Sequence, residues 1–304
     1  MLLIPALVSA APVDKNPVVA KEAEAARYQA AVDRSTAAAE KSEKLSGEEE
    51  AARLLNLGVD HAERKNWDRA IEFFEKAKAL NPQNSAVHID LALAYIETKD
   101  PVKAIASAQT AVKLASGKAS AYHTLGLAYE ASGDTVKAIE TYKSGLAADP
   151  KNSDLYLTLG NLYGREKDLD NAVKAYEKAI ETNPKNVFAY SNLAYIHQEM
   201  KQPEKAVEYL SRATQADPSD DVAWFDLGAA QEKQGDRAKA IESYEKSYSL
   251  NEQSYKATLS LALAYEKQGK LEKAASFYTK ALSLTDDIRL KEAIIKKITQ
   301  TSEK

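Results

Sequence analysis

Histidine and tyrosine are the residue types in this sequence whose side chains could form a metal site or a catalytic site. The chain has no cysteine, and its four histidines are His61, His88, His123 and His197. Three of them stand where tyrosine recurs elsewhere in the chain, so we expect His61, His88 and His197 to pack as aromatic side chains. His123 has no second histidine at ligand spacing on its helix, and thiolate ligands are absent. The sequence therefore predicts no metal site and no cofactor.

The sixteen tyrosines are the largest set of chemically capable side chains, but eleven of them recur at fixed spacing and are predicted to be core residues. The sequence contains no P-loop, no nucleophile elbow and no glycine-rich dinucleotide loop after a predicted strand. Repeats occupy nearly all of the length and leave no room for a catalytic domain. We therefore predict that the protein is not an enzyme.

The elements that position these side chains repeat with a period of 34 residues from Ala51 to Ile288, without insertion or deletion. Each period contains a small residue preceded by leucine, and an alanine follows twelve residues later. A period of this length indicates an array of supersecondary units. The small residues are Gly58, Ala92, Gly126, Gly160, Ala194, Gly228 and Ala262, and the alanines are Ala70, Ala104, Ala138, Ala172, Ala206, Ala240 and Ala274.

Each unit is predicted to be a helical hairpin. Tyr156, Leu159 and Gly160 share one helical face, and Ala172 begins the apolar face of a second helix. Because glycine within a helix costs about 1 kcal/mol relative to alanine, we expect Gly160 and Ala172 to mark the closest approach of the two helices. Gly164 has no counterpart in the other units. Three units have a glycine between the helices that suits a left-handed helix end: Gly133, Gly235 and Gly269.

This pattern resembles the tetratricopeptide repeat, whose signature combines an aromatic residue, Leu-Gly, tyrosine, alanine, a second aromatic residue, alanine and proline. The first aromatic residue is present as Tyr122, Tyr156, Tyr190 and Trp224. The resemblance implies an all-α fold, a right-handed α-solenoid of seven helical hairpins. The predicted units are 51–84, 85–118, 119–152, 153–186, 187–220, 221–254 and 255–288.

The segments outside the repeats have different patterns. Residues 289–304 are predicted to form a capping helix with Leu290, Ile294, Ile295 and Ile298 on one apolar stripe. Residues 12–50 are rich in alanine, glutamate and lysine and are predicted to form an extra N-terminal helix, either solvated or paired through an alanine seam. Residues 1–11 resemble the end of an export signal, with a peptidase site at residues 8–10. That reading places the protein outside the cytoplasm, and a frayed terminus of a cytoplasmic protein is the alternative.

A second stripe on the first helix of each unit is the candidate binding surface. In proteins of the resembled family this stripe lines a concave groove that holds a peptide. Adjacent first helices could also bury part of the stripe against one another. We expect the rings of Phe188, Tyr195 and Phe225 to border one pocket, with Asn161 and Asn192 as hydrogen-bonding partners. The predicted groove residues are Leu55, Val59, Ile89, Leu93, Leu127, Asn161, Phe188, Asn192, Tyr195 and Phe225.

One subclass of the family grips a C-terminal carboxylate with two asparagines and three cations. Asn161 and Asn192 match the two asparagines, but Leu157, Val222 and Asp226 stand where the cations belong. A carboxylate buried without a cationic partner is costly. This subclass consists of co-chaperones, which bind the C-terminal tail of a chaperone. The sequence therefore predicts that the groove does not bind a chaperone tail in this way.

Composition limits the partner class. The chain has 41 basic and 45 acidic residues and a net charge of −4, which does not suit a phosphate backbone. The apolar run of residues 2–10, nine residues long, is too short to span a bilayer as a helix. We predict a non-catalytic adaptor that binds a peptide or helix of a partner protein. The alternative is a self-assembling scaffold, a homo-oligomer that uses its ends or the N-terminal helix.

Overall fold

The computed structural model describes residues 46–302, and this part of the chain contains fifteen helices and no strand. The predictions for residues 1–11 and for the helix before residue 46 lie outside the described part. None of the described helices is long and apolar enough to cross a bilayer. The helices are α2 (Gly47–Glu63), α3 (Trp67–Leu80), α4 (Ser85–Glu97), α5 (Pro101–Leu114), α6 (Ala119–Ala131), α7 (Thr135–Ala148), α8 (Ser153–Arg165), α9 (Leu169–Thr182), α10 (Val187–Glu199), α11 (Pro203–Ala216), α12 (Asp221–Gln234), α13 (Arg237–Leu250), α14 (Tyr255–Lys267), α15 (Leu271–Ser283) and α16 (Ile288–Ser302).

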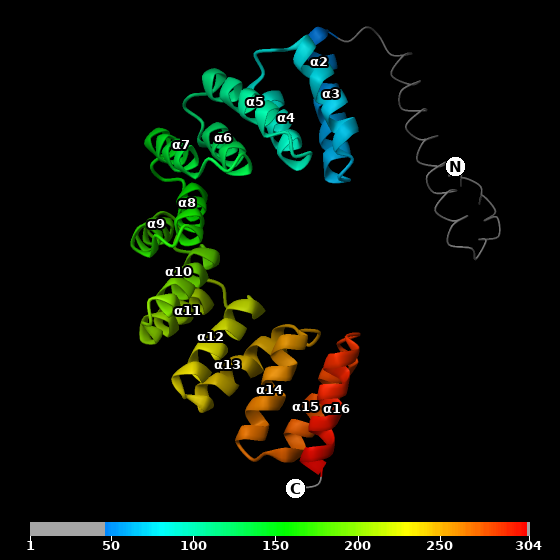
Figure 1. Ribbon diagram of the computed structural model, residues 1–304, viewed down its shortest axis with the longest axis vertical. Helices are drawn as coiled ribbons and strands as arrows, with labels where there is room; N and C mark the ends of the chain where they lie inside the picture. Colours follow the sequence, from blue (N-terminus) through cyan, green and yellow to red (C-terminus); the bar gives the residue numbers. More distant parts are fainter. Residues whose placement is uncertain (1–45, 303–304) are drawn as a thin grey trace, which may run out of the picture.

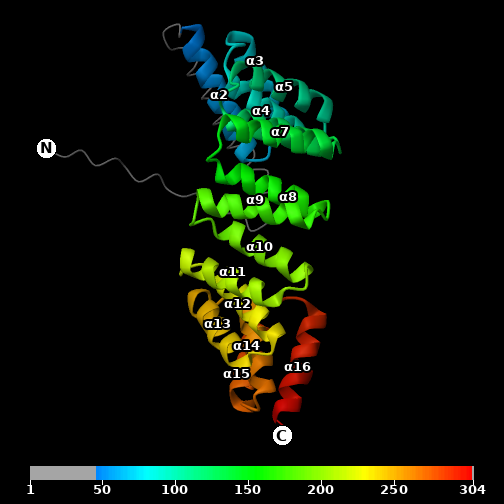
Figure 2. The same ribbon diagram turned by 90° about the vertical axis from the view of Figure 1, so that its left-hand side faces the viewer.

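Consecutive helices pack as pairs, α2 with α3 through α14 with α15, and the second helix of each pair packs on the first helix of the next. The pairs follow one another along a curved array with α2 and α16 at opposite ends (Figures 1 and 2). From α4 to α14, every first helix begins at the first residue of a predicted unit. Seven pairs and a final helix fit the seven predicted repeats. The all-α solenoid is therefore confirmed.

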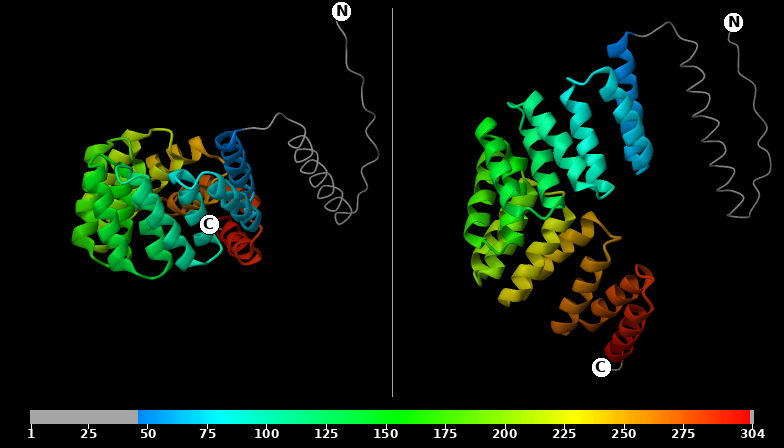
Figure 3. Two further views of the ribbon diagram at one scale, coloured as in Figure 1. Left: turned by 90° about the horizontal axis from the view of Figure 1, so that it is seen from above. Right: turned by 45° about the horizontal axis from the view of Figure 1, so that its top comes forward.

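The curvature gives the array an inner and an outer side. Around its middle, α6 and α8 lie on the inner side and α7 and α9 on the outer side (Figure 1). The views in Figure 3 show the same curved band of helix pairs from above and tilted forward. The first helices of the pairs therefore provide the concave surface on which the predicted groove residues were placed.

The alanine in the first turn of the second helix of each unit is part of the core. All seven of these alanines are at most 1% exposed. At Gly160, however, the nearest atoms to an added Cβ belong to the Tyr176 ring, at 2.6 Å, and not to Ala172. Gly58, Gly126 and Gly228 face Phe74, Tyr142 and Tyr244 in the same way. The glycines thus make room for the aromatic ring one turn after the alanine, and at Gly228 the added Cβ would also lie 3.1 Å from the backbone oxygen of Ala240.

The turn between the two helices of every pair contains one residue with positive φ. Three of these are the predicted glycines, with φ between 76° and 87° at Gly133, Gly235 and Gly269. The other four are lysines with φ between 58° and 61°: Lys65, Lys99, Lys167 and Lys201. All seven turns therefore use the left-handed region, although only glycine adopts it without a steric cost.

The last helix packs against α15. Ile294 is 3% exposed there, and Ile298 packs partly buried against the same core. Leu290 and Ile295 are 39% and 52% exposed, so they do not belong to the buried face. The predicted four-residue stripe was wrong at these two positions, because the buried face follows the four-residue step from Ile294 to Ile298.

Candidate functional site

The predicted groove residues differ widely in exposure. Val59 and Leu93 are 36% and 37% exposed, whereas Leu55 packs partly buried against the core formed with Phe74. Ile89 and Leu127 are half-buried. Adjacent helices thus cover part of the predicted stripe, as the alternative interpretation expected.

The predicted rings of Phe188, Tyr195 and Phe225 do not line one pocket together. One of the two pockets described here contains Tyr195, and the other contains Phe188. Tyr195 is 56% exposed and lines a central pocket. Phe188 is 72% exposed and lines a separate pocket beside Leu157 and Asp220. Phe225 lines neither pocket, and its ring centroid lies 5.6 Å from that of Tyr244.

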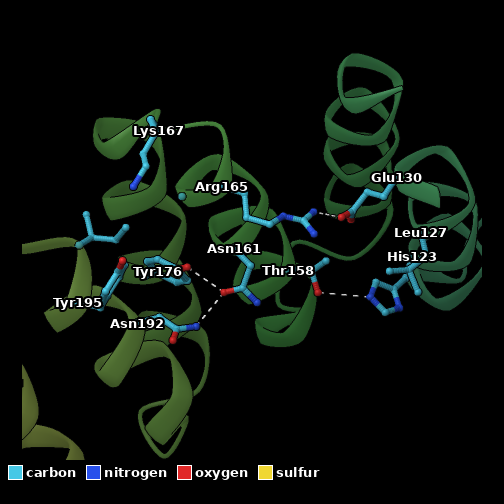
Figure 4. A pocket seen from close by; sticks show the side chains of 12 residues that line it. His123, Leu127, Glu130, Thr158, Asn161, Arg165, Lys167, Tyr176, Asn192 and Tyr195 are labelled. Atoms are coloured by element: carbon cyan, nitrogen blue, oxygen red, sulfur yellow. Dashed lines mark hydrogen bonds and ion pairs between the residues drawn. The ribbon is translucent and has the colours of Figure 1, made fainter. Parts of the chain in front are cut away.

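The central pocket is a cavity of about 620 Å³ that opens on α6, α8 and α10 (Figure 4). It contains four of the predicted groove residues, Leu127, Asn161, Asn192 and Tyr195, and so both asparagines of the predicted hydrogen-bonding pair. Because these three helices are first helices of successive pairs, the pocket lies on the concave surface. The remaining lining residues are His123, Glu130, Thr158, Gly164, Arg165, Lys167, Tyr176 and Ile196.

Asn161 is the centre of a hydrogen-bond network at the pocket wall. The Tyr176 hydroxyl and the Asn192 side-chain amide both donate to Asn161 Oδ1, each at 2.8 Å (Figure 4). Burial raises the pKa of Tyr176 to about 12, so the phenol keeps its proton at neutral pH. The network therefore links two adjacent repeats and presents amide groups to the pocket.

His123 contributes a neutral ring to the opposite wall. Burial lowers the pKa of His123, and its Nε2 lies 3.3 Å from the Thr158 hydroxyl. The other three histidines are 3% to 8% exposed, and the rings of His61 and His197 stack on Phe73 and Tyr209. Their predicted role as packed aromatic residues is consistent with these contacts.

Two ion pairs border the pocket. Arg165 pairs with Glu130, which also accepts a hydrogen bond from the Tyr142 hydroxyl. Lys167 Nζ lies 3.3 Å from Glu199 Oε2 on the next first helix. Within residues 46–302, no cluster of three His, Asp or Glu side chains could hold a metal ion. The arrangement offers amides, hydroxyls, ion pairs and apolar carbons, which are groups that bind a polypeptide.

Family models match most of the chain. The model of the cilia and flagella-associated protein 70 C-terminal domain matches residues 90–301, and the tetratricopeptide repeat model matches residues 51–84. The chain belongs to the tetratricopeptide repeat family. Members of this family interact with other proteins through their helical repeats. No curated protein matches the chain in sequence.

Three solved structures are similar to this tetratricopeptide repeat chain. Part of a repeat protein from Cytophaga hutchinsonii is 17% identical, with a TM-score of 0.61, and the match covers 78% of this chain and 98% of that one. YrrB, a tetratricopeptide repeat protein described as having an unusual peptide-binding site, is 21% identical, with a TM-score of 0.50 and coverages of 62% and 97%. MamA is 30% identical, with a TM-score of 0.48 and coverages of 53% and 94%.

Sequence reasoning missed several residues of the central pocket. Tyr176 had been assigned to the core, and its ring is buried, but its hydroxyl reaches the pocket. Arg165 and Lys167 lie at the end of α8 and in the following turn, outside the predicted stripe. The one available signal was Gly164, the glycine that does not recur in other units.

Proposed function

We propose that the protein is a non-catalytic adaptor that binds a peptide or helix of a partner protein in its concave groove, at the central pocket between α6, α8 and α10. The observation that carries this proposal is the pocket itself. It combines an exposed aromatic ring, Tyr195, with side-chain amides from two adjacent repeats.

The chemistry of the pocket supports a polypeptide ligand. Asn161 uses its oxygen to accept two hydrogen bonds, and its amide nitrogen can donate to a ligand carbonyl. Leu127, Ile196 and the Tyr195 ring provide apolar area for a side chain. Binding energy in interfaces is concentrated at aromatic anchors of this kind. YrrB, which shares the fold, is described as having a peptide-binding site.

Site-specific photocrosslinking in the native cell tests the proposal. A photoreactive phenylalanine analogue replaces Tyr195 in one variant and Val136 in the other. Val136 is the matched control because it is 68% exposed on the second helix α7. We expect a discrete adduct with another protein at position 195 and none at position 136.

Two results would contradict the adaptor proposal. Adducts at position 136 but not at 195 would place the partner on the outer side of the array. Adducts at position 195 only between copies of this chain, together with a sedimentation coefficient above that of a monomer, would instead support the self-assembling scaffold.

A further inference from the structure

Three repeats contain the same side-chain arrangement between their two helices. A tyrosine on the second helix donates a hydrogen bond from its hydroxyl to a glutamate near the end of the first helix. The pairs are Tyr142 with Glu130, Tyr244 with Glu232 at 3.1 Å, and Tyr278 with Glu266 at 2.5 Å.

Each of these glutamates also forms an ion pair with a basic side chain on a later helix. Glu130 pairs with Arg165, Glu232 with Lys267 at 2.5 Å, and Glu266 with Lys297 at 3.0 Å. The three glutamate side chains are only 15% to 27% exposed. Each carboxylate thus connects a phenol of its own repeat to a cation of the next helix pair or of α16.

The fourth repeat has the tyrosine but not the carboxylate. Gly164 stands in α8 at the position that corresponds, 34 residues away, to Glu130. The Tyr176 hydroxyl, which lacks a glutamate partner, donates to Asn161 instead. The position that corresponds to Arg165 is Glu199, which is paired with Lys167. Of the four repeats that have tyrosine at this position of the second helix, the fourth repeat alone lacks the glutamate, and its Gly164 lines the central pocket.

The missing carboxylate leaves both space and suitable partners. An added Cβ at Gly164 would have only two neighbours within 4 Å, Ile196 Cδ1 at 3.4 Å and the Tyr176 hydroxyl oxygen at 3.8 Å. Lys167 and Arg165 line the same cavity, and Glu130 is its single acidic lining residue. Arg165 is paired with Glu130, and Lys167 is paired at 3.3 Å with Glu199, both with exposed side chains, so Lys167 is the cation that can turn to a ligand carboxylate.

We infer that the partner supplies the missing group: the central pocket binds an aspartate or glutamate side chain within a peptide segment of the partner. This inference rests on the proposed function. The ligand carboxylate takes the position that glutamate has in three other repeats. It accepts a hydrogen bond from the Tyr176 hydroxyl, whose one O–H then donates to it instead of to Asn161, and another from Lys167, which turns to it from Glu199. The Tyr195 ring and Leu127 contact the residues on either side of it.

Peptide display tests the inference directly. Random dodecapeptides, joined to the phage coat protein through their C-termini, are selected on the full-length chain, so that no free C-terminal carboxylate is presented. Selected sequences are synthesised with amidated C-termini and labelled, and their dissociation constants are measured by fluorescence anisotropy. We expect an acidic residue at one aligned position. Its replacement by glutamine or asparagine should weaken binding at least about tenfold, or 1.4 kcal/mol.

Variants of the protein locate the acidic residue in the pocket. Gly164→Glu places a carboxylate from the chain itself in the gap, and we expect at least about tenfold weaker peptide binding. Val136→Glu adds the same charge to exposed α7 and should leave binding unchanged. Lys167→Gln, in an exposed turn, removes the cation without filling the gap and should also weaken binding. Circular dichroism melting checks that each variant is folded.

The outcomes separate this inference from the proposed function. Peptides that share no acidic residue, but lose affinity in Tyr195→Ala, would overturn the inference and leave groove binding intact. Affinity that rises more than tenfold when the C-terminus is left free would also overturn it, because a chain end and not a side chain would then be the ligand. Failure to select any peptide whose binding depends on Tyr195 would count against both.

Discussion

Glycine has two distinct uses within the same helix of this repeat protein. An added Cβ at Gly160 would lie 2.6 Å from the Tyr176 ring, whereas one at Gly164 would have an ordinary contact at 3.4 Å. Gly160 therefore makes room for an aromatic residue of the core. Gly164 leaves open a space that glutamate fills in other repeats.

The two glycines should respond differently to alanine. Gly160→Ala overpacks the Tyr176 ring and should lower the free energy of unfolding by about 1–3 kcal/mol. Gly164→Ala improves helix propensity without a close contact and should raise it by up to about 1 kcal/mol. Chemical denaturation of both variants measures the difference. Equal effects at the two sites would contradict the packing described here.

A half-buried carboxylate on α4, that of Asp90, predicts a pH dependence of stability. Burial raises the pKa of Asp90 to about 6. A group whose pKa is higher in the folded state favours folding at low pH, and this contribution is lost as pH rises from about 4 to above 6. At pH 7, Asp90→Asn should therefore be more stable than the parent chain, by at most about 3 kcal/mol. At pH 4 the two should be nearly equal.

Denaturation midpoints at both pH values measure this effect. Asp60→Asn, at an exposed position of α2, is the matched control and should show no such change. A stability difference between Asp90→Asn and the parent chain that is the same at pH 4 and pH 7 would show that burial does not perturb Asp90.

At the scale of the helices, the sequence predicted most of the fold. The 34-residue period placed the start of every first helix from α4 to α14, because each begins at the first residue of a predicted unit. It also identified the seven alanines of the core. The lysines in left-handed turns were not foreseen, since glycine is the residue that usually signals this conformation.

The turns provide a test at this scale. Gly133 has a φ of +81°, which a side chain adopts only at a cost, so Gly133→Ala should destabilise the chain by about 1 kcal/mol. Gly117→Ala is the matched control. Neither glycine has an atom within 4 Å of an added Cβ, but Gly117 does not have a left-handed φ. Gly117→Ala should be neutral or slightly stabilising. Destabilisation by both would indicate a cause other than φ.

At the scale of the whole molecule, the curved array of repeats has a concave surface, and the central pocket lies on it. The sequence identified Leu127, Asn161, Asn192 and Tyr195, all of which line the central pocket. It did not identify the pocket, because the cavity is lined by side chains from three successive repeats, and the pattern within one repeat does not specify how these side chains meet. Phe188 and Phe225 were grouped with Tyr195 from their size and stripe position, but they do not line the central pocket.

The dissociation constant of the partner captured at position 195 tests the central claim most directly. It is measured by isothermal titration with the purified full-length chain, with Tyr195→Ala/Asn192→Ala, and with the outer-face control Val102→Ala/Val136→Ala, whose side chains are 77% and 68% exposed. Groove binding predicts at least about tenfold weaker affinity for the first double variant and no change for the second. Unchanged affinity of a folded Tyr195→Ala/Asn192→Ala variant, or loss of affinity only in the outer-face control, would contradict it.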